Sequence, residues 1–305
     1  MKSKADIIDI IKDLPTAYFS EEDSVEVVTG QNSNAQDARL KQVMEVITRH
    51  LHAAIKEIEP SQEEWMKAIL FLTATGHKSD DWRQEYILLS DVLGVSMLVD
   101  AINSRRPDGA SENTVLGPFH VGEAPEYPMG ANICQDGKGE DMVVRGRVLD
   151  VDGNPLEGVK IDVWQANDEG FYDVQQKGIQ PNFNLRGVFR TGPDGTYWFK
   201  AVRPKHYAIP DDGPVGELLY ALGRHPYRPA HLHYILSKEG YDEVTTHIFD
   251  PDDIFINNDA VFGVKESLIA DFSKVEDRDR IEEMNFDGPY YWDVDFDFVM
   301  AEKSK

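Results

Sequence analysis

The sequence has little that would suit an oxidising compartment or a membrane. Its 305 residues contain a single cysteine, Cys134, so no disulfide can form within the chain. No apolar run approaches the roughly 20 residues that a bilayer-spanning helix needs. Asp6, Asp9 and Asp13 interrupt the N-terminal isoleucines where a signal peptide would have its apolar core. We therefore expect a cytoplasmic protein with no membrane insertion.

Positive charge is also scarce. The chain has 31 lysines and arginines against 55 aspartates and glutamates, which gives a formal net charge of −24. Nucleic-acid phosphates bind to positive surfaces, so this balance argues against a nucleic-acid partner. It also disfavours strongly anionic small molecules, whereas a neutral phenol would meet no opposing field.

The first hundred residues show the periodicity of helices. Apolar side chains recur at steps of three and four from Leu40 to Ile58 and form one stripe. A shorter helix before it should end at Pro15. The stripe can pack within its own domain, and a self-complementary pair of such helices would form a two-fold dimer. The sequence leaves both possibilities open.

Two further helices are predicted after this stripe. Ser61 followed by Glu64 has the spacing of a capping box, so a helix should begin there and end near Gly76. The apolar pattern restarts at Ser79 and continues towards Ile102.

The pattern changes after a polar, turn-rich stretch at residues 105–109. Short segments with alternating apolar and polar side chains follow, separated by turns rich in glycine, proline and aspartate. The alternating segments are 142–149, 159–163, 197–201 and 292–298, and the clearest turns are 152–155 and 193–195. We predict a mainly β protein with an α-helical N-terminal segment: a helical domain over 1–110 and a β-sandwich over 111–305.

The sharpest local motif is His231-Leu232-His233. On a strand, both imidazoles project from one face and can bind a metal with little rearrangement. Many such pairs merely lie on a solvated strand face, so the spacing alone does not decide. Tyr172 and Tyr207 follow strand–loop transitions, but most tyrosines are core aromatics with a tethered hydroxyl.

Longer stretches of the C-terminal half resemble the intradiol ring-cleavage dioxygenases. The matching stretches are Val159–Asn167, Gly170–Tyr172, Phe183–Arg186, Thr191 with Asp194–Tyr197, Leu222–His225 and Arg228–His233. They occur in the family's order and at family-like separations. The helical half resembles the dimerisation segment of the catechol and hydroxyquinol branch, so the resemblance covers almost the whole chain.

This resemblance implies a metal centre with four protein ligands. It makes Tyr172 and Tyr207 tyrosinate ligands and His231 and His233 imidazole ligands of one Fe(III) per subunit. A phenol with a pKa near 10 ionises at neutral pH only if a strong Lewis acid holds its oxygen. Zinc rarely takes paired tyrosinates, and iron(II) enzymes favour two histidines with a carboxylate. The residue types therefore agree with Fe(III).

The resemblance also assigns catalytic roles. Tyr207 is the ligand that the incoming diol displaces, and Arg228 stabilises negative charge on the bound ring. The alternative for Arg228 is a structural salt bridge in an acidic protein. His247 stands where catechol-type relatives usually have glutamine, so it either tunes Arg228 and the diolate or fills space. We assign no role to His120.

The implied reaction is cleavage of a small aromatic diol by O2. In the family, the substrate cavity is lined by segments corresponding to Leu88–Asp91 and Val115–Phe119. The residues expected to contact substrate are Leu88, Asp91, Leu116, Gly117, Pro118, Phe119, Ile209, Pro210, Arg228 and Val261. Segments 245–249 and 259–265 resemble hydroxyquinol 1,2-dioxygenases, which favours benzene-1,2,4-triol cleaved to 3-hydroxymuconate, or maleylacetate. Asp91 would accept a hydrogen bond from the third hydroxyl, or it is an ordinary helix carboxylate.

Other functions remain open at this stage. Catechol or a substituted catechol is the alternative substrate. A non-catalytic, ligand-binding β-sandwich would give the same fold, because a sandwich does not determine function. A zinc hydrolase would need a general base beside the metal, and no H-E-x-x-H motif is present. The resemblance further implies a homodimer through the N-terminal helices and allows a phospholipid between them.

Overall fold

The computed structural model describes residues 8, 11, 12, 14, 17–81 and 83–303. The helix end predicted at Pro15 lies outside these residues. The chain forms two compact units, residues 1–73 and 74–305. No helix among the described residues combines the length and the apolar character needed to cross a membrane.

The first unit is helical. Its helices are α2 (Ser24–Gly30), α3 (Ala38–Ile58) and the first part of α4 (Gln62–Lys78). Ser61 and Glu64 form the predicted capping box: the Ser61 N–H donates to the Glu64 carboxylate at 2.8 Å, and the Glu64 N–H donates to Ser61 Oγ at 3.2 Å. The predicted end at Gly76 is wrong by two residues, because α4 continues to Lys78.

The apolar stripe of α3 is exposed on the chain. Its exposed members are Leu40, Met44, Ile47, Leu51, Ile55 and Ile58. The stripe is therefore not buried in a core of the first unit. An apolar stripe of this length left in water is unusual for a monomer.

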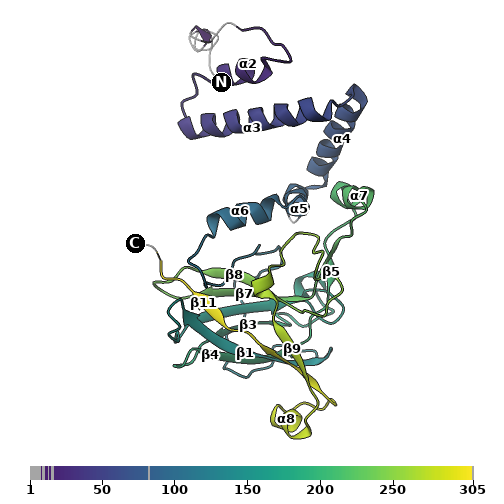
Figure 1. The fold of residues 1–305 in the computed structure, drawn as a ribbon. Coiled ribbons are helices and arrows are strands. Elements are labelled where there is room, and N and C mark those ends of the chain that lie inside the picture. The colour runs from purple at the N-terminus through teal and green to yellow at the C-terminus, as the bar shows by residue number, and fades with distance from the viewer. Residues whose placement is uncertain (1–7, 9–10, 13, 15–16, 82, 304–305) are drawn as a thin grey trace. The chain divides into compact units, whose positions relative to one another are not determined.

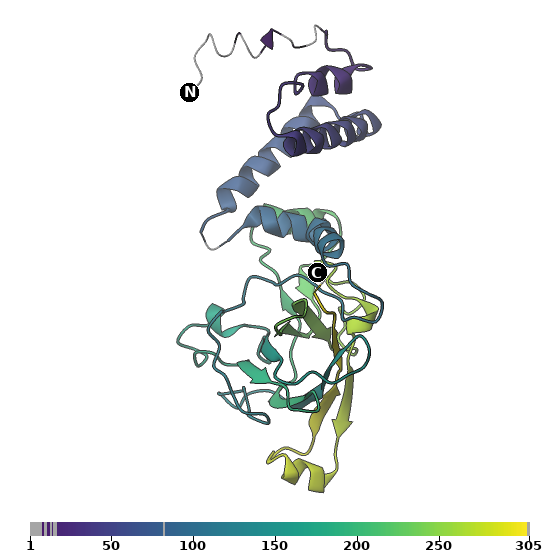
Figure 2. The ribbon, with the colours of Figure 1, turned by 90° about the vertical axis from the view of Figure 1, so that its left-hand side faces the viewer.

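The second unit carries four α-helices among its described residues. They are α5 (Glu85–Val92), α6 (Val95–Asn103), α7 (Pro214–Ala221) and α8 (Arg278–Glu283), with 3₁₀ turns η1 (Asp173–Gln175) and η2 (Glu266–Leu268). The single helix predicted from Ser79 to Ile102 is wrong, because Gly94 (φ 72°) separates α5 from α6. Helices α5, α6 and α7 gather at one end of the strands, whereas α8 lies at the other (Figures 1 and 2).

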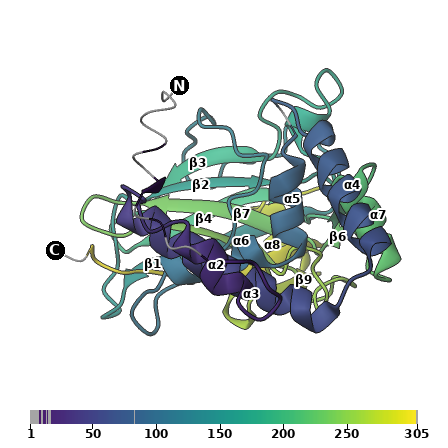
Figure 3. The ribbon, with the colours of Figure 1, turned by 90° about the horizontal axis from the view of Figure 1, so that it is seen from above.

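The strands form two main sheets. They are β1 (Asp141–Asp150), β2 (Lys160–Gln165), β3 (Arg186–Arg190), β4 (Thr196–Val202), β5 (Tyr207–Ala208), β6 (Tyr227–Arg228), β7 (His231–Ser237), β8 (Val244–Phe249), β9 (Asp271–Val275), β10 (Tyr291–Asp295) and β11 (Phe298–Met300). One sheet has the order β11-β1-β10-β9 with β4 also paired to β1, and the other has the order β3-β2-β7-β8. Figure 3 shows β3, β2 and β7 as neighbours. Strands β5 and β6 form a separate two-stranded ribbon.

A single apolar core joins the two sheets. It combines side chains of the first sheet, such as Met142 and Phe199, with side chains of the second, such as Ile161, Leu232 and Ile248. This confirms the prediction of a helical N-terminal segment followed by a mainly β domain. At about 25 cal/mol per Å² of buried apolar surface, such a core is the main source of stability for the strands.

The predicted alternation holds in β1 and needs correction near the C-terminus. Met142 and Val144 are fully buried, and Arg145 on the opposite face pairs with Asp293 at 2.9 Å. Asp293 itself is buried and also pairs with Arg280 at 2.9 Å. The last segment is two strands, β10 and β11, rather than one.

Candidate metal centre

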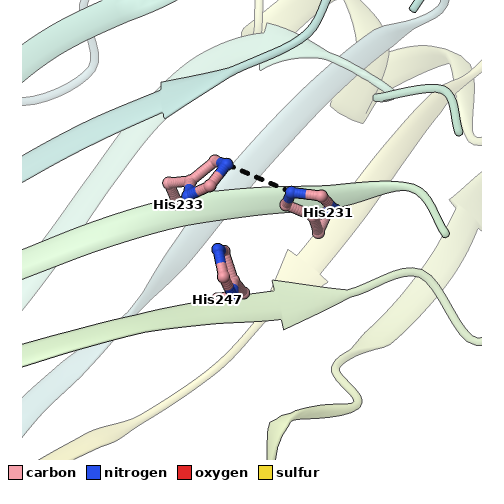
Figure 4. Close-up of side chains that lie close together, drawn as sticks. All are labelled: His231, His233 and His247. Atoms are coloured by element: carbon pink, nitrogen blue, oxygen red, sulfur yellow. Dashed lines mark hydrogen bonds between the residues drawn. The ribbon is translucent and has the colours of Figure 1, made fainter. Parts of the chain in front are cut away.

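The face of β7 that points away from the core carries the two histidines of the His-x-His motif. Leu232 between them belongs to the core, whereas His231 and His233 are buried on the opposite face. His247 on β8 is the direct cross-strand partner of His233. Ligand nitrogens of the three histidines lie within 4.8 Å of one another. Figure 4 shows the ring of His247 directed from β8 towards His233 on β7.

The ring nitrogens of the motif converge. His231 Nε2 and His233 Nε2 are 3.1 Å apart (Figure 4), and the Tyr172 hydroxyl lies 2.8 Å from His233 Nε2. His231 Nδ1 lies 2.7 Å from the Pro229 carbonyl, which can only accept a hydrogen bond. Nδ1 therefore carries the proton and Nε2 presents a lone pair, the arrangement usual for metal-binding histidines.

Both predicted tyrosines belong to this cluster. Tyr172, just before η1, and Tyr207 on β5 are buried, with ring centroids 5.4 Å apart at 90°. The Tyr207 ring also lies 5.6 Å from the His231 ring. The structure thus brings together all four residues predicted as ligands.

The donor set fits a cation. Two nitrogens that bind the same metal at about 2.1 Å, with their bonds at right angles, lie about 3 Å apart. The distance of 3.1 Å between His231 Nε2 and His233 Nε2 is close to this value. Burial, followed by the charge of Arg228, lowers the pKa of His231 to about 3, so its imidazole is neutral and ligand-competent. Burial, with Tyr207 beside it, raises the pKa of Tyr172 well above its usual value. A buried phenol of this kind ionises when a cation is bound.

Arg228 supplies a fixed positive charge beside the tyrosines. It is the cross-strand partner of Tyr207 in the β5–β6 ribbon and is 3% exposed. Burial disfavours its charge, but the neighbouring Asp259 carboxylate and the Tyr207 oxygen outweigh this and raise the pKa of Arg228. The guanidinium therefore stays charged at every pH at which the protein is folded.

His247 is held by a residue that the sequence did not single out. Its Nδ1 hydrogen bonds the hydroxyl of Thr114, which is buried and anchored by its backbone to Thr245. Its Nε2 has no hydrogen-bond partner among the described residues. Burial, together with the neighbouring His231 ring and the charge of Arg228, lowers the pKa of His247 well below 6.5. A neutral imidazole with one unused nitrogen therefore faces the cluster.

Several residues predicted to contact substrate also gather near the cluster. Leu88, Ile209 and Val261 belong to one apolar group. The Phe119 ring stacks on Tyr172 with centroids 4.7 Å apart. A Cβ added at Gly117 (φ 76°) would lie 3.1 Å from the His233 ring, so the backbone there approaches the ring closely.

The polar residue of this set, Asp91, lies half-buried near the end of α5. Burial raises the pKa of Asp91, while a hydrogen bond from Ser96 and the charge of Arg228 oppose the rise. Three other predicted contacts, Leu116, Pro118 and Pro210, are exposed. The described contacts do not join these three to the buried cluster.

A row of side chains across the second sheet supports the cluster. Arg186 on β3, Trp164 on β2, His233 on β7 and His247 on β8 are successive cross-strand partners. The Trp164 and His233 rings stack with centroids 4.7 Å apart at 11°. This stack fixes the orientation of the His233 ring, whose Nδ1 has no hydrogen-bond partner among the described residues.

Sequence reasoning missed three supporting residues, Thr114, Trp164 and Asp259. Each falls in or beside a family-like stretch, but no pattern of spacing indicates which ring or guanidinium it contacts. His120, to which we assigned no role, lies against Trp164 with ring centroids 4.6 Å apart and contacts Asp162 at 3.3 Å.

Comparisons with known proteins agree with this geometry. Residues 117–301 match the family model described as dioxygenase, and residues 37–111 match the catechol dioxygenase N terminus. A hydroxyquinol 1,2-dioxygenase of Rhizobium sp. is 68% identical over 93% of this chain and 96% of its own length. A 6-chlorohydroxyquinol 1,2-dioxygenase of Cupriavidus pinatubonensis is 45% identical over 92% of this chain and 98% of its own length.

A solved structure shows the same likeness in three dimensions. The crystal structure of hydroxyquinol 1,2-dioxygenase from Pseudomonas putida superposes with a TM-score of 0.87 at 44% identity, covering 93% of this chain and 99% of that one. The likeness spans both the helical N-terminal segment and the β domain. The chain therefore belongs to the intradiol ring-cleavage dioxygenase family.

Proposed function

We propose that this enzyme cleaves hydroxyquinol, benzene-1,2,4-triol, between its adjacent hydroxyls with O2, to give 3-hydroxymuconate or maleylacetate. The observation that carries the proposal is the convergence of Tyr172, Tyr207, His231 and His233 in one buried cluster beside Arg228. The substrate class of the family is a catechol-type diol together with O2, and the family implies non-haem iron. Relatives named for hydroxyquinol or its chloro derivative support the triol as the particular substrate.

In this proposal the four clustered side chains hold one Fe(III) per subunit. Two tyrosinates are hard anionic ligands, and they favour iron(III) over zinc or iron(II). When bound, the metal supplies a Lewis acid that ionises the phenols and the diol and withdraws electron density from the ring. The chain positions the ligands through the Trp164 stack on His233 and the Pro229 hydrogen bond to His231.

Tyr207 and Arg228 act on the incoming diol. The Tyr207 oxygen takes up one diol proton and then remains as a neutral phenol next to Tyr172. Arg228 keeps its positive charge in a dry site, where it stabilises the negative charge that develops on the ring of the bound diol. Phe119 and the group around Val261 exclude water from this space.

The third hydroxyl of the triol is assigned to Asp91. Asp91 is a half-buried residue near the end of α5, the helix whose Leu88 belongs to the same apolar group as Ile209 and Val261. A hydrogen-bonding group in such a pocket discriminates strongly against a substrate that lacks its partner. Catechol has no hydroxyl at that position, so Asp91 would favour hydroxyquinol.

Oxygen uptake tests the substrate directly. Iron-loaded enzyme is supplied with hydroxyquinol or with catechol at equal concentrations, and the ring-opened products are identified. Faster turnover of hydroxyquinol supports the proposal. Faster turnover of catechol to muconate would assign the enzyme to the alternative substrate, and no oxygen uptake on either would favour a non-catalytic sandwich.

The helical first unit is proposed to form a homodimer, which is typical of the family. The exposed α3 stripe, with Leu51 and Ile55, supplies the apolar surface for it. An apolar hollow of about 990 Å³, lined by these residues together with Trp65, Ile69 and Leu72, is large enough for acyl chains of a phospholipid. We keep residues 1–110 as the dimerisation domain and 111–305 as the catalytic domain of this proposal.

A further inference from the structure

Asp259 makes a two-point contact with Arg228 inside the protein. Arg228 Nε lies 3.2 Å from Asp259 Oδ1, and Nη2 lies 3.3 Å from Oδ2. The Arg228 side chain is 3% exposed and the Asp259 side chain 1%. A paired contact of this kind fixes both the position and the plane of a guanidinium, whereas a single contact leaves it free to rotate.

The same carboxylate also fixes the loop that follows it. Asp259 Oδ1 accepts a hydrogen bond from the Val261 N–H at 3.2 Å, and Oδ2 accepts one from the Gly263 N–H at 2.9 Å. The Ala260 N–H donates to the Tyr227 carbonyl, on the residue before Arg228. The substrate-facing Val261 and the guanidinium therefore share one anchor.

Gly263 shows how tightly this loop encloses the guanidinium. A Cβ added there would lie 2.7 Å from Arg228 Nη2 and 3.0 Å from Asp259 Oδ2. Real Cβ atoms do not approach other atoms so closely, so any larger residue would push Arg228 away from its place. The loop thus holds the guanidinium of Arg228, the cross-strand partner of Tyr207, against Asp259.

We infer that Asp259 is a positioning residue for catalysis: it orients the Arg228 guanidinium towards the ring of the bound diol. In this inference Asp259 contacts neither substrate nor metal and affects the reaction only through Arg228. This inference rests on the proposed role of Arg228, so its test must separate the two.

The test is a double-mutant cycle with Asp259→Asn, Arg228→Met and the double variant Arg228→Met/Asp259→Asn. Asparagine keeps the shape of the side chain but removes the charge and one of the two acceptors. In the Asp259→Asn variant, kcat for hydroxyquinol should fall roughly 10- to 100-fold, the effect of a misplaced catalytic group, while KM changes much less. Iron content and the visible spectrum should stay those of the wild type.

The decisive comparison is made without Arg228. If Asp259 acts through Arg228, adding Asp259→Asn to Arg228→Met should change kcat by less than about twofold. An undiminished loss in that background would overturn the inference, and so would wild-type kcat in the single variant. If the wild type itself cleaves no diol, the proposed function is wrong. This result is distinguishable from a failure of the inference about Asp259, in which the wild type is active.

Two further variants guard against a folding defect. Gly263→Ala keeps both charges and should also lower kcat, because its Cβ displaces the guanidinium. Wild-type kcat for Gly263→Ala would contradict the inference even if Asp259→Asn did not fold. Asp293→Asn is the matched control. Asp293 is also a buried carboxylate paired with an arginine, but this pair with Arg145 lies in the sheet that contains β1 and β10. Its kcat should equal that of the wild type.

Discussion

Tyr207 and Arg228 are direct cross-strand partners in a ribbon of only two residues per strand. This pairing places a permanent positive charge beside the phenol that is proposed to leave the metal and accept a proton. Neither strand is long enough to be recognised from periodicity, since two residues show no alternation. The pairing of Tyr207 with Arg228, which matters most for the chemistry, is therefore visible only in the folded chain.

Arg228→Ala should keep its iron and lose turnover. The four proposed ligands do not include Arg228, whereas a charge clamp of this kind is worth roughly 100- to 1000-fold in kcat. Iron content by metal analysis and kcat by oxygen uptake check the prediction. Loss of iron from the folded variant would instead assign Arg228 a structural role, with the buried Asp259 left unpaired.

His247→Gln separates a ligand from a substrate-facing residue. A ring nitrogen of His247 lies within 4.8 Å of ring nitrogens of His231 and His233. The Nδ1 atom of His247, however, hydrogen bonds the Thr114 hydroxyl. We expect the variant to keep its iron and visible colour, and to shift the ratio of kcat/KM for hydroxyquinol over catechol towards catechol. Loss of iron without loss of fold would show that three histidines bind the metal.

Asp91→Asn should weaken the preference for the triol. The carboxylate is proposed to bind the third hydroxyl, so kcat/KM for hydroxyquinol should fall about tenfold or more. Catechol lacks that hydroxyl, and its kcat/KM should stay within about threefold of the wild type. Catechol thus serves as the internal control, and an equal loss on both substrates would indicate that Asp91 only supports α5.

The iron-free protein should lose stability as the pH falls below about 6.5. His231 has a pKa of about 3 in the folded chain, and burial also lowers the pKa of His233 and His247 well below 6.5. At a pH between these lowered pKa values and the pKa of about 6.5 that histidine has in the unfolded chain, the unfolded chain binds more protons than the folded one. The free energy of unfolding therefore decreases with falling pH. Urea unfolding of iron-free wild type at pH 7.5 and 5.5 measures the slope.

The comparison with His247→Gln isolates this effect from the many carboxylates. The variant has one buried titrating group fewer, so its stability should change less between the two pH values. An equal or steeper decrease in the variant would show that these histidines do not control the acid sensitivity.

The sequence predicted the elements with strong periodicity and missed those fixed by single contacts. The capping box at Ser61 and the alternation of Met142 and Val144 in β1 are local patterns, and both are found in the structure. The break at Gly94 was missed because the apolar pattern continues through it. The buried Asp293 pairs with Arg145, 148 residues away, which no local pattern can report.

The candidate site shows the same division. Strand alternation explains why His231 and His233 share a face, and only the family resemblance selected Tyr172 and Tyr207 among the tyrosines. The supporting contacts of Thr114 with His247, and of Asp259 with Arg228, join residues 133 and 31 positions apart. Such contacts depend on the packing of loops against the sheet, so they could not be read from spacing.

The visible absorption spectrum of the iron-loaded enzyme tests the central claim most directly. Charge transfer from two tyrosinates to Fe(III) should make the purified protein wine-red, and Tyr172→Phe and Tyr207→Phe should each alter this absorption without unfolding the chain. Removal of the iron by a strong chelator should abolish the colour and the cleavage of hydroxyquinol together. A colourless protein that is replete with iron would contradict the assignment of Tyr172 and Tyr207 as ligands.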